Sequence, residues 1–242
     1  MIESSPMRAL VIIPALNEER NLPRVLEALR RDAKGWDICV VDDGSTDGTA
    51  AVARKHGAFV LRLGVNLGIG GAVQTGYLWA REQGYQVAAQ IDGDGQHDPL
   101  FLTAALAPIA AGQADLVVGS RYLAAGGFKS SALRRAGSRY FSWFLRLRCG
   151  ARVTDPTSGF RVAGRRAIAL FAGAYPSDYP EPEAIALAVR HGLSLCEIPV
   201  AMRQREHGES SIGFGDTLVY LLKVSLALLL LPPRKRAPEP GT

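Results

Sequence analysis

The sequence predicts an α/β domain built on a mostly parallel sheet flanked by helices, and three observations predict it. Short apolar runs, typical of strands buried on both faces, recur along the chain, beginning with residues 9–13. Segments with helical spacing of apolar residues separate these runs, and this alternation is typical of βαβ units. The chain has 242 residues, of which 48% are hydrophobic and 21% charged, which fits one sizeable domain with at most a small appendage.

Strands and helices are expected to alternate along most of the chain. The predicted strands cover residues 9–13, 38–41, 58–61, 86–89, 115–119 and 195–200. The predicted helices cover residues 22–29, 51–57, 73–80, 99–111, 133–147, 179–192 and 216–231, the first with Asn21 as its cap. Right-handed crossovers between parallel strands place the carboxyl ends of those strands at one edge of the sheet. The polar segments 14–18, 42–45, 66–71 and 92–96 should therefore meet there.

The segment around Asp92 and Asp94 is the strongest functional signal. It follows the predicted strand 86–89, and residues i and i+2 of an extended chain face the same way. Gly93 between them allows a bulky ligand to approach the backbone. Two convergent carboxylates at the end of a strand suit a divalent metal that carries a diphosphate. An acidic turn without a ligand is the alternative, because Asp and Gly are common turn residues.

Two further segments bear on the kind of nucleotide. Gly68 and Gly70 are followed by Val73, so the G-x-G-x-x-G pattern of dinucleotide folds is not completed, and hydride transfer is disfavoured. Asp42 and Asp43 follow a strand, and a carboxylate there can accept a hydrogen bond from a base N–H. A helix-capping turn is the alternative role for that segment, and both roles can hold at once.

Five motifs occur in an order that resembles a known family. They are Pro14-Ala-Leu-Asn-Glu18, Val41-Asp-Asp-Gly-Ser45, Gln90-x-Asp-x-Asp-x-Gln-His97, Gly119-Ser-Arg-Tyr122 and Ser158-Gly-Phe-Arg161. Together they resemble family-2 inverting glycosyltransferases, in particular the dolichyl- and polyprenyl-phosphate mannose or glucose synthases, over roughly residues 8–212. The resemblance implies a Rossmann-like GT-A domain over residues 1–212, with an apolar helix and a basic, Pro-rich tail over 213–242. It also implies a nucleoside-diphosphate-sugar donor, Mg²⁺ or Mn²⁺, and a polyprenyl phosphate acceptor.

The resemblance assigns roles to individual positions. Nucleotide contacts would come from Pro14, Leu16, Glu18, Asp42, Asp43, Asn66, Gly68 and Asp92, with Asp43, or alternatively Asp42, reading the base. Metal and diphosphate would be held by Asp92, Asp94 and Gln96. Phosphate contacts on the acceptor side would come from Arg121, Arg134, Arg135, Arg139, Arg205 and Ser210. Two positions depart from the family pattern: Ser211 replaces the lysine of the R-x-x-G-x-S-K signature, and residue 16 is Leu where this branch often has Tyr.

The acceptor determines whether a base is needed. A phosphate acceptor is already an anion and needs no strong base, whereas an alcohol acceptor would need one. Glu183 is the candidate base and Glu181 the second, although a carboxylate in the first turn of a helix also has a purely structural explanation. Three functions therefore remain: an inverting transferase acting on a lipid phosphate, a family-2 enzyme acting on a soluble or polysaccharide hydroxyl, and a non-catalytic nucleotide-sugar binder. The sequence names neither the sugar nor the base.

Two helical segments suggest contact with a membrane surface. Residues 133–147 mix arginines with aromatic side chains, as interfacial helices do. Residues 218–231 are almost wholly apolar, but a helix of that length reaches about 21 Å, short of the ~30 Å of a hydrocarbon core. With Lys223 and the basic run 234–236, we expect it to lie in the interface, giving a peripheral protein on the cytoplasmic, inner face of a membrane. A buried core helix and a docking face for a small membrane-protein partner are the alternatives. The net charge of +5 comes with no nucleic-acid recognition module, so no nucleic-acid partner is expected.

Overall fold

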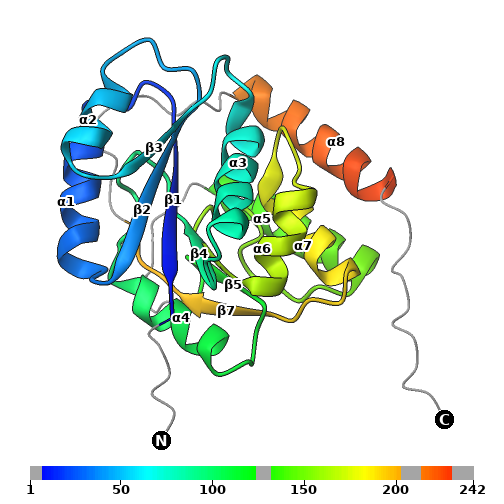
Figure 1. The fold of residues 1–242 in the computed structure, drawn as a ribbon. Helices are drawn as coiled ribbons and strands as arrows, with labels where there is room; N and C mark the ends of the chain where they lie inside the picture. The colour runs from blue at the N-terminus through cyan, green and yellow to red at the C-terminus, as the bar shows by residue number, and fades with distance from the viewer. Residues whose placement is uncertain (1–6, 124–131, 203–213, 231–242) are drawn as a thin grey trace, which may run out of the picture.

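A seven-stranded sheet forms the centre of the molecule (Figure 1). Its strands are β1 (Ala9–Ala15), β2 (Trp36–Asp42), β3 (Phe59–Arg62), β4 (Val87–Gln90), β5 (Leu116–Ser120), β6 (Arg161–Gly164) and β7 (Leu195–Pro199). Their order is β3-β2-β1-β4-β6-β5-β7, and only β6 runs antiparallel to its neighbours. This is the predicted mixed α/β architecture with a mostly parallel sheet. The structure is a computed structural model that describes residues 7–123, 132–202 and 214–230, with side chains beginning at 135 and 220 in the last two of these ranges.

Helices cover both faces of this sheet. They are α1 (Leu22–Asp32), α2 (Thr49–Lys55), α3 (Gly68–Glu82), α4 (Phe101–Ala110), α5 (Ala132–Cys149), α6 (Arg165–Gly173), α7 (Pro180–Arg190) and α8 (Phe214–Leu230). Buried side chains of α1, α2 and α4 pack in one core, and those of α3, α5, α6, α7 and α8 pack in the other. The two cores lie on opposite faces of the sheet because successive residues of a strand point in opposite directions.

β1 explains why its sequence is a continuous apolar run. Leu10 and Ile12 point into the core beneath α3, whereas Val11 and Ile13 point into the core beneath α1, and none of the four is exposed. A strand with a core on each face has no side for polar residues. β1 continues to Ala15, beyond Ile12, which is its last residue paired with β4. Pro14 is tolerated here although β1 is a central strand, because only one neighbouring strand, β2, still pairs with β1 at this position.

β6 and α6 are the elements that the sequence did not predict. β6 has only four residues and begins at Arg161, a charged side chain that is 0% exposed. Its pairing places Arg161 opposite Gln90 at the end of β4 and opposite Val118 of β5. The strand therefore begins at the carboxyl edge of the parallel strands and carries a buried cation to that edge.

α8 is partly a core helix and partly a surface helix. Val224 and Leu228 are buried, and the Tyr220 ring lies edge-on to Phe141 of α5, with 5.2 Å between the ring centroids. Leu222 and Leu226 are 64% and 57% exposed. Within the described ranges, no helix is long and apolar enough to cross a membrane. The sequence offered a buried helix and an interfacial helix as alternatives, and the helix has one side suited to each.

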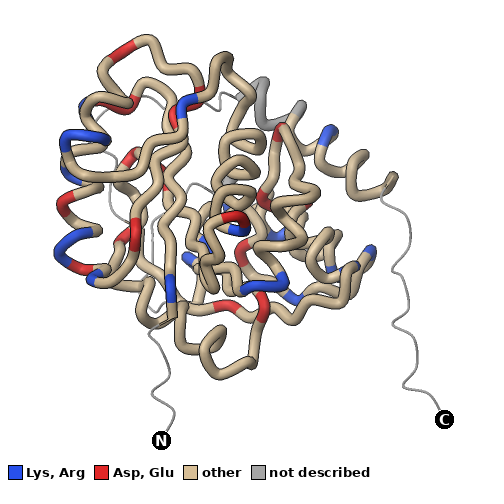
Figure 2. The backbone as a smooth tube through the Cα atoms, viewed as in Figure 1, with Lys and Arg blue, Asp and Glu red and all other residues tan. Residues whose placement is uncertain are grey.

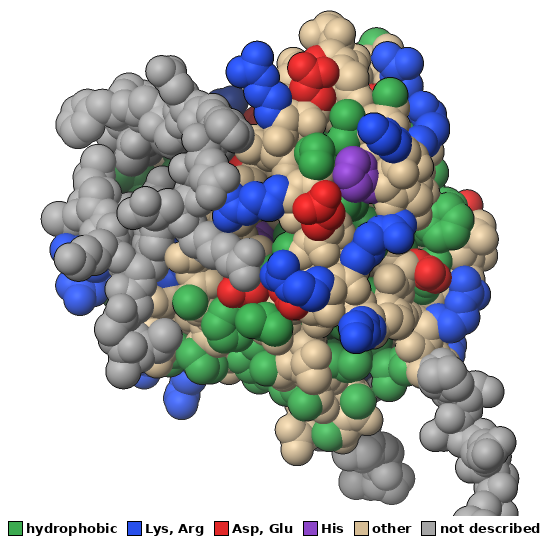
Figure 3. Space-filling view, turned by 90° about the vertical axis from the view of Figure 1, so that its left-hand side faces the viewer, with side chains coloured by type: hydrophobic (Ala, Val, Ile, Leu, Met, Phe, Trp, Pro, Cys, Tyr) green, Lys and Arg blue, Asp and Glu red, His purple; other side chains and the backbone are tan. Residues whose placement is uncertain are grey.

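The surface charge is mixed rather than segregated on the side that carries α1 and α2. Figure 2 shows Lys and Arg along these helices with Asp and Glu between them. The space-filling view of this side in Figure 3 likewise has basic and acidic side chains interspersed. The net charge of +5 is thus not gathered into one basic patch on this side of the molecule.

Candidate active site

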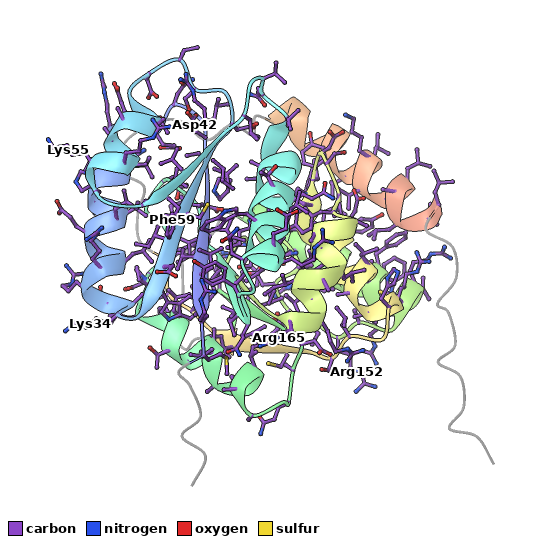
Figure 4. The ribbon with its side chains drawn as sticks, in the orientation of Figure 1. Lys34, Asp42, Lys55, Phe59, Arg152 and Arg165 are labelled. Carbon is purple, nitrogen blue, oxygen red and sulfur yellow. The ribbon has the colours of Figure 1, made fainter. Side chains whose placement is uncertain are left out.

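The polar segments after β1, β2, β3 and β4 gather at one edge of the sheet. The parallel register of these strands puts their carboxyl ends together, as the sequence predicted. Figure 4 labels Asp42 at this edge, and Arg165, which follows the antiparallel β6, at the opposite edge. Open α/β sheets bind ligands at the carboxyl ends of their strands, so this edge is the candidate site.

Hydrogen bonds join the loops after β1 and β2. The N–H of Asn17 donates to Ser45 Oγ (2.9 Å), and the N–H of Glu18 donates to Thr49 Oγ1 (2.8 Å). In return, the N–H of Thr46 donates to Asn17 Oδ1 (2.9 Å). Asn17 has a φ of 56°, in the left-handed region that asparagine tolerates better than most residues. The two loops are therefore one unit, from which the side chain of Leu16 projects with 43% exposure.

Asp42 and Asp43 are both buried and both hold backbone in place. Asp42 Oδ1 accepts the N–H of Ser45 (2.9 Å), and its Oδ2 lies 3.4 Å from Nε of Arg62. Asp43 Oδ1 accepts the N–H of Leu67 (2.7 Å), which ties the loop after β3 to β2. Among the described residues, Asp43 Oδ2 receives no hydrogen bond, so Asp43 keeps an acceptor for a ligand. Asp43 can therefore hold this loop closed and still offer an oxygen to a ligand.

Gly44 must be glycine for that loop to close. Its φ is +76°, and a Cβ added there would lie 3.0 Å from the backbone nitrogen of Asn66. The left-handed conformation and the close approach of the second loop both exclude a side chain. Asn66 Oδ1 accepts the N–H of Gly68 (2.8 Å) at the start of α3, so both residues shape the loop beside Asp43.

The turn after β4 holds the two predicted metal ligands in different ways. The side chain of Asp92 is 38% exposed, and its Oδ2 lies 3.8 Å from Nε2 of His97. Asp94 Oδ1 accepts the N–H of Gln96 (3.0 Å), which closes the turn. A Cβ added to Gly159 would come within 2.8 Å of Asp92 Oδ2, so the backbone of the segment before β6 lies against this carboxylate.

His97 lies behind this turn and is 4% exposed. Its Nδ1 accepts the N–H of Asp92 (3.1 Å). Burial lowers the pKa of His97 to about 4, a shift that the nearby charge of Asp94 partly offsets. The imidazole is therefore neutral at physiological pH, and both carboxylates of the turn lie within its electrostatic reach.

The donor atoms at this turn fit a divalent cation that is shared with a substrate. Across the described residues, no group of three or more His, Cys, Asp and Glu side chains could hold a metal alone. Mg²⁺ is commonly bound by one or two carboxylates together with the phosphates of the substrate. Asp92 and Asp94 match that pattern, whereas a complete protein cage for a structural metal is not formed by the described residues.

Arg121 is buried and forms a bidentate ion pair with Asp155. Its Nε donates to Asp155 Oδ2 (2.6 Å), and its Nη2 donates to Asp155 Oδ1 (2.7 Å) and to Thr157 Oγ1 (2.8 Å). Burial alone would lower the pKa of Arg121, but the hydrogen bonds and charge of Asp155 outweigh it and raise the pKa. Only Nη1 remains for a ligand, and it lies 3.8 Å from the sulfur of Met202.

Arg161 ties the segment before β6 to the start of α7. Its Nε donates to the carbonyl of Ser158 (3.2 Å), and its Nη2 donates to the carbonyls of Pro156 (3.4 Å) and Glu181. Its Nη1 is buried without a hydrogen-bond partner in the described part of the chain. One buried guanidinium thus sets the position of Glu181 relative to the segment that contacts Asp92.

Glu181 and Glu183 lie in the first turn of α7, but only Glu181 is electrostatically close to the Asp92 turn. Burial raises the pKa of Glu181, and the charges of Arg161, Asp92 and Arg121 also act on it. Burial likewise raises the pKa of Glu183, but the charges that act on it are those of Asp178 and Glu181. The charge of the predicted metal ligand Asp92 therefore acts on the second candidate base, Glu181, and is not among the charges that shift the pKa of the first.

The arginines predicted to contact acceptor phosphates are only partly described. Arg135 and Arg139 are exposed, one turn apart, on α5. α5 reaches the site through Ser138, whose Oγ donates to the carbonyl of Thr154 (3.3 Å), next to Asp155. The side chain of Arg134 and the whole of Arg205 and Ser210 lie outside the described residues.

Comparison with known proteins places the chain in a family. The sequence profile of Glycosyl transferase family 2 matches residues 10–170, which include all five motifs in full and the first residues of α6. The chain belongs to glycosyl transferase family 2. The resemblance inferred from the motifs is thereby confirmed at the level of the family, and this protein is a glycosyltransferase by membership.

Similar curated proteins of the family match this glycosyltransferase over nearly their whole length. The polyprenol monophosphomannose synthase of Mycolicibacterium smegmatis is 32% identical over 231 residues, covering 90% of this chain and 86% of that protein. The undecaprenyl-phosphate mannosyltransferase of Micrococcus luteus is 34% identical over 236 residues, covering 91% and 95%.

Solved structures agree on the fold. Glucosyl-3-phosphoglycerate synthase from Mycobacterium tuberculosis, crystallised with Mn²⁺, uridine diphosphate and glucosyl-3-phosphoglycerate, superposes with a TM-score of 0.71. It is 22% identical, and the match covers 98% of this glycosyltransferase and 82% of that chain. The GT-A fold expected from the sequence is therefore confirmed.

Three residues of this family-2 glycosyltransferase contribute to the site although the sequence assigned them no role. Asp155 holds Arg121, His97 holds the backbone of Asp92, and Arg161 joins two segments of the site. Only the positions of these residues in the sequence could have drawn attention to them. His97 and Arg161 are the last residues of two family motifs, and Asp155 lies three residues before the motif that begins at Ser158. Nothing in a one-dimensional pattern identifies which carboxylate will pair with a buried arginine.

Proposed function

We propose that this glycosyltransferase moves a sugar from a nucleoside-diphosphate sugar to a polyprenyl phosphate, with inversion and with Mg²⁺ or Mn²⁺. The observation that carries the proposal is the likeness to the two relatives above, which are named for polyprenyl acceptors and match over most of both chains. A third relative from Methanococcus voltae, 29% identical over 242 residues, is named as an N-acetylglucosaminyltransferase acting on dolichyl phosphate.

On the donor side, the loops after β1, β2 and β3 would hold the nucleoside. Asp43 would accept a hydrogen bond from the base through Oδ2, while its Oδ1 keeps the loop closed. Asp92, Asp94 and Gln96 would hold the metal and the diphosphate. A bound divalent cation supplies charge neutralisation for the nucleoside diphosphate as the glycosidic bond breaks. Attack from the face opposite the leaving group would convert an α-linked donor into a β-linked product.

On the acceptor side, the role of Arg121 is narrower than the sequence suggested. Three of its hydrogen bonds go to Asp155 and Thr157, so only Nη1 would reach a phosphate. Arg135 and Arg139 of α5 would supply exposed positive charge for the lipid phosphate. Because a phosphate is already anionic, no strong base is required in this reaction.

We also propose that two neighbouring helices rest on the inner face of a membrane. The α5–α8 apolar surface consists of the exposed side chains Trp143, Leu147, Leu222, Leu226, Leu229 and Leu230. Tyr140 and Ser225 join the two helices by a hydrogen bond between their hydroxyls (2.8 Å). Exposed apolar side chains bordered by arginine suit the headgroup region of an anionic bilayer.

The test is transfer of labelled sugar into an organic-extractable product. The purified chain would be incubated with Mn²⁺, undecaprenyl phosphate and, separately, GDP-mannose, UDP-glucose and UDP-N-acetylglucosamine. Label in the organic phase with one donor, and acid release of the intact sugar, would support the proposal. Label that appears only on a soluble or polysaccharide acceptor would favour a hydroxyl-directed family-2 enzyme with Glu183 as its base. Donor binding without transfer to any acceptor would favour a nucleotide-sugar binder.

A further inference from the structure

His97 is buried between the turn that carries Asp92 and Asp94 and two neighbouring segments. Its ring meets the Phe160 ring edge-on, with centroids 5.8 Å apart. Its backbone forms an isolated antiparallel bridge with Met202, after β7. Nε2 of this ring is buried and has no hydrogen-bond partner in the described part of the chain. A buried polar atom without a hydrogen-bond partner costs free energy, so the position of Nε2 requires an explanation.

The hydrogen bond to Nδ1 determines which ring nitrogen carries the proton. Nδ1 accepts the N–H of Asp92 at 3.1 Å, and a nitrogen that accepts a hydrogen bond carries no proton itself. An imidazole without a proton on Nδ1 must carry one on Nε2. That nitrogen lies 3.8 Å from Asp92 Oδ2, a little beyond hydrogen-bond length. One imidazole thus holds the backbone of Asp92 and carries an N–H that lies 3.8 Å from its carboxylate.

We propose that His97 is a positioning residue, whose Nε2–H orients the carboxylate of Asp92 for a divalent cation. A small rotation of the Asp92 side chain would close the 3.8 Å gap. The backbone at Gly159 also lies close to this carboxylate, since a Cβ there would lie 2.8 Å from Oδ2. The inference rests on the proposed function, because it requires Asp92 to be a metal ligand. Partners that orient metal ligands contribute about 10- to 100-fold to metal affinity.

Two substitutions separate the two nitrogens of the ring. In His97→Asn the amide oxygen lies near the position of Nδ1, so the N–H of Asp92 keeps its acceptor while the second donor is lost. In His97→Gln the amide nitrogen reaches approximately the position of Nε2 and can donate to the carboxylate. The measurement is calorimetric binding of GDP and of UDP, each with and without Mn²⁺. It reports the increase in nucleotide affinity that Mn²⁺ provides, independently of turnover.

The expected result is a selective loss in one variant. His97→Asn should bind nucleotide as wild type does without metal but lose about 10- to 100-fold of the gain from Mn²⁺. His97→Gln should keep most of that gain. His191→Asn, the same change at the C-terminal end of α7, is the matched control and should keep all of it. If His97→Asn does not fold, loss of the Mn²⁺ gain in His97→Gln, which keeps the second donor, would still overturn the inference.

Two results would overturn the inference while leaving the proposed function intact. One is a full Mn²⁺ gain in His97→Asn, and the other is an equal loss in His97→Asn and His97→Gln. In the second case the packing of the ring or its contact with the backbone, rather than the Nε2–H, would account for the lost Mn²⁺ gain. If wild type binds no nucleoside diphosphate in the presence of Mn²⁺, the proposed function fails and the inference fails with it.

Discussion

Asp92 and Asp94 differ in what they do before any ligand arrives. Asp94 Oδ1 accepts the N–H of Gln96 and closes the turn, whereas Asp92 lies against His97 and Gly159. Asparagine also has an oxygen that can close the turn, so Asp94→Asn removes charge with little effect on local structure. A side chain that is predicted to hold a metal can therefore be tested without unfolding its loop.

We expect Asp94→Asn to keep its melting temperature and to lose about two to four orders of magnitude in turnover, the scale of lost charge stabilisation. Transfer rates and thermal melts would be measured together. Asp98→Asn is the control, because Asp98 Oδ1 likewise accepts a backbone N–H two residues on, from Leu100 (3.2 Å). Undiminished turnover in EDTA would contradict the metal assignment.

Arg121 shows how a predicted ligand-binding residue can also be structural. Asp155 is 0% exposed, so Arg121→Ala would leave a buried carboxylate without its main partner. We expect this variant to lose about 3–5 kcal/mol of folding free energy together with acceptor affinity. Arg54→Ala, which removes an exposed arginine of α2, should change neither. Chemical denaturation and the acceptor KM measure the two effects, and unchanged stability in Arg121→Ala would show that the ion pair is dispensable.

Glu183 distinguishes the two kinds of acceptor. Burial raises its pKa, so a reaction that used it as a base would speed up as pH rises through that raised pKa and the carboxylate forms. With a phosphate acceptor, we expect Glu183→Gln to retain a substantial rate and an unchanged pH profile. Loss of activity to background in a folded Glu183→Gln, with Glu181→Gln active, would instead favour a hydroxyl acceptor. The pH dependence of kcat for both variants decides between these results.

At the scale of elements, α8 has two sides with different roles. Val224 and Leu228 pack into the core, while Leu222 and Leu226 remain outside it. The hydrogen bonds from Arg148 to the carbonyl of Leu229 (2.8 Å) and between Tyr140 and Ser225 hold α8 beside α5. The exposed leucines therefore have a fixed position relative to Trp143, as a surface that docks on a bilayer requires.

We expect Leu226→Asp to weaken pelleting with anionic liposomes without changing the melting temperature, because the side chain is 57% exposed. Leu100→Asp is the matched control, since Leu100 is 59% exposed and lies just before α4, which packs in the other core. Equal pelleting of the two variants would argue against the α5–α8 apolar surface as the membrane contact.

At the scale of the whole molecule, charge and apolar surface are expected to act together. The chain carries a net charge of +5, and α5 exposes Arg135, Arg139 and Arg146 beside the apolar surface. Pelleting of the full chain should therefore fall when salt rises from 0.1 M to 1 M, as the Debye length shrinks from about 10 Å to about 3 Å. Zwitterionic liposomes are the comparison, and salt-independent binding to both would exclude an electrostatic contribution.

Deleting everything after Gly215 is a less selective test of membrane binding than the sequence suggests. If α8 were only an interfacial helix, this deletion would leave nucleotide binding intact. The structure has Val224 and Leu228 in the core with α5 and α7, so the deletion also uncovers apolar surface that they cover. Single substitutions on the exposed side avoid that effect. The boundary between a domain over 1–212 and a tail over 213–242 accordingly remains a prediction.

The sequence by itself determined the features that local pattern encodes. Short apolar-rich runs identified six of the seven strands. The clearest are β1, β4 and β5, which are buried along their whole length and so have almost no polar positions. Polar turns after those runs located the site, because parallel strands bring their carboxyl ends to one edge. The order of short motifs identified the family, which the match over residues 10–170 confirms.

Only the tertiary structure decided how the side chains at that edge are paired. β6 is a four-residue strand beginning with arginine, and it becomes recognisable only when β4 and β5 supply its hydrogen-bond partners. Arg121 and Asp155 form an ion pair although they are 34 residues apart in the chain. His97 accepts the N–H of Asp92 while its ring packs edge-on against Phe160, which lies far away in the sequence. Such contacts depend on which segments the sheet brings together, and neither residue type nor spacing along the chain carries that information.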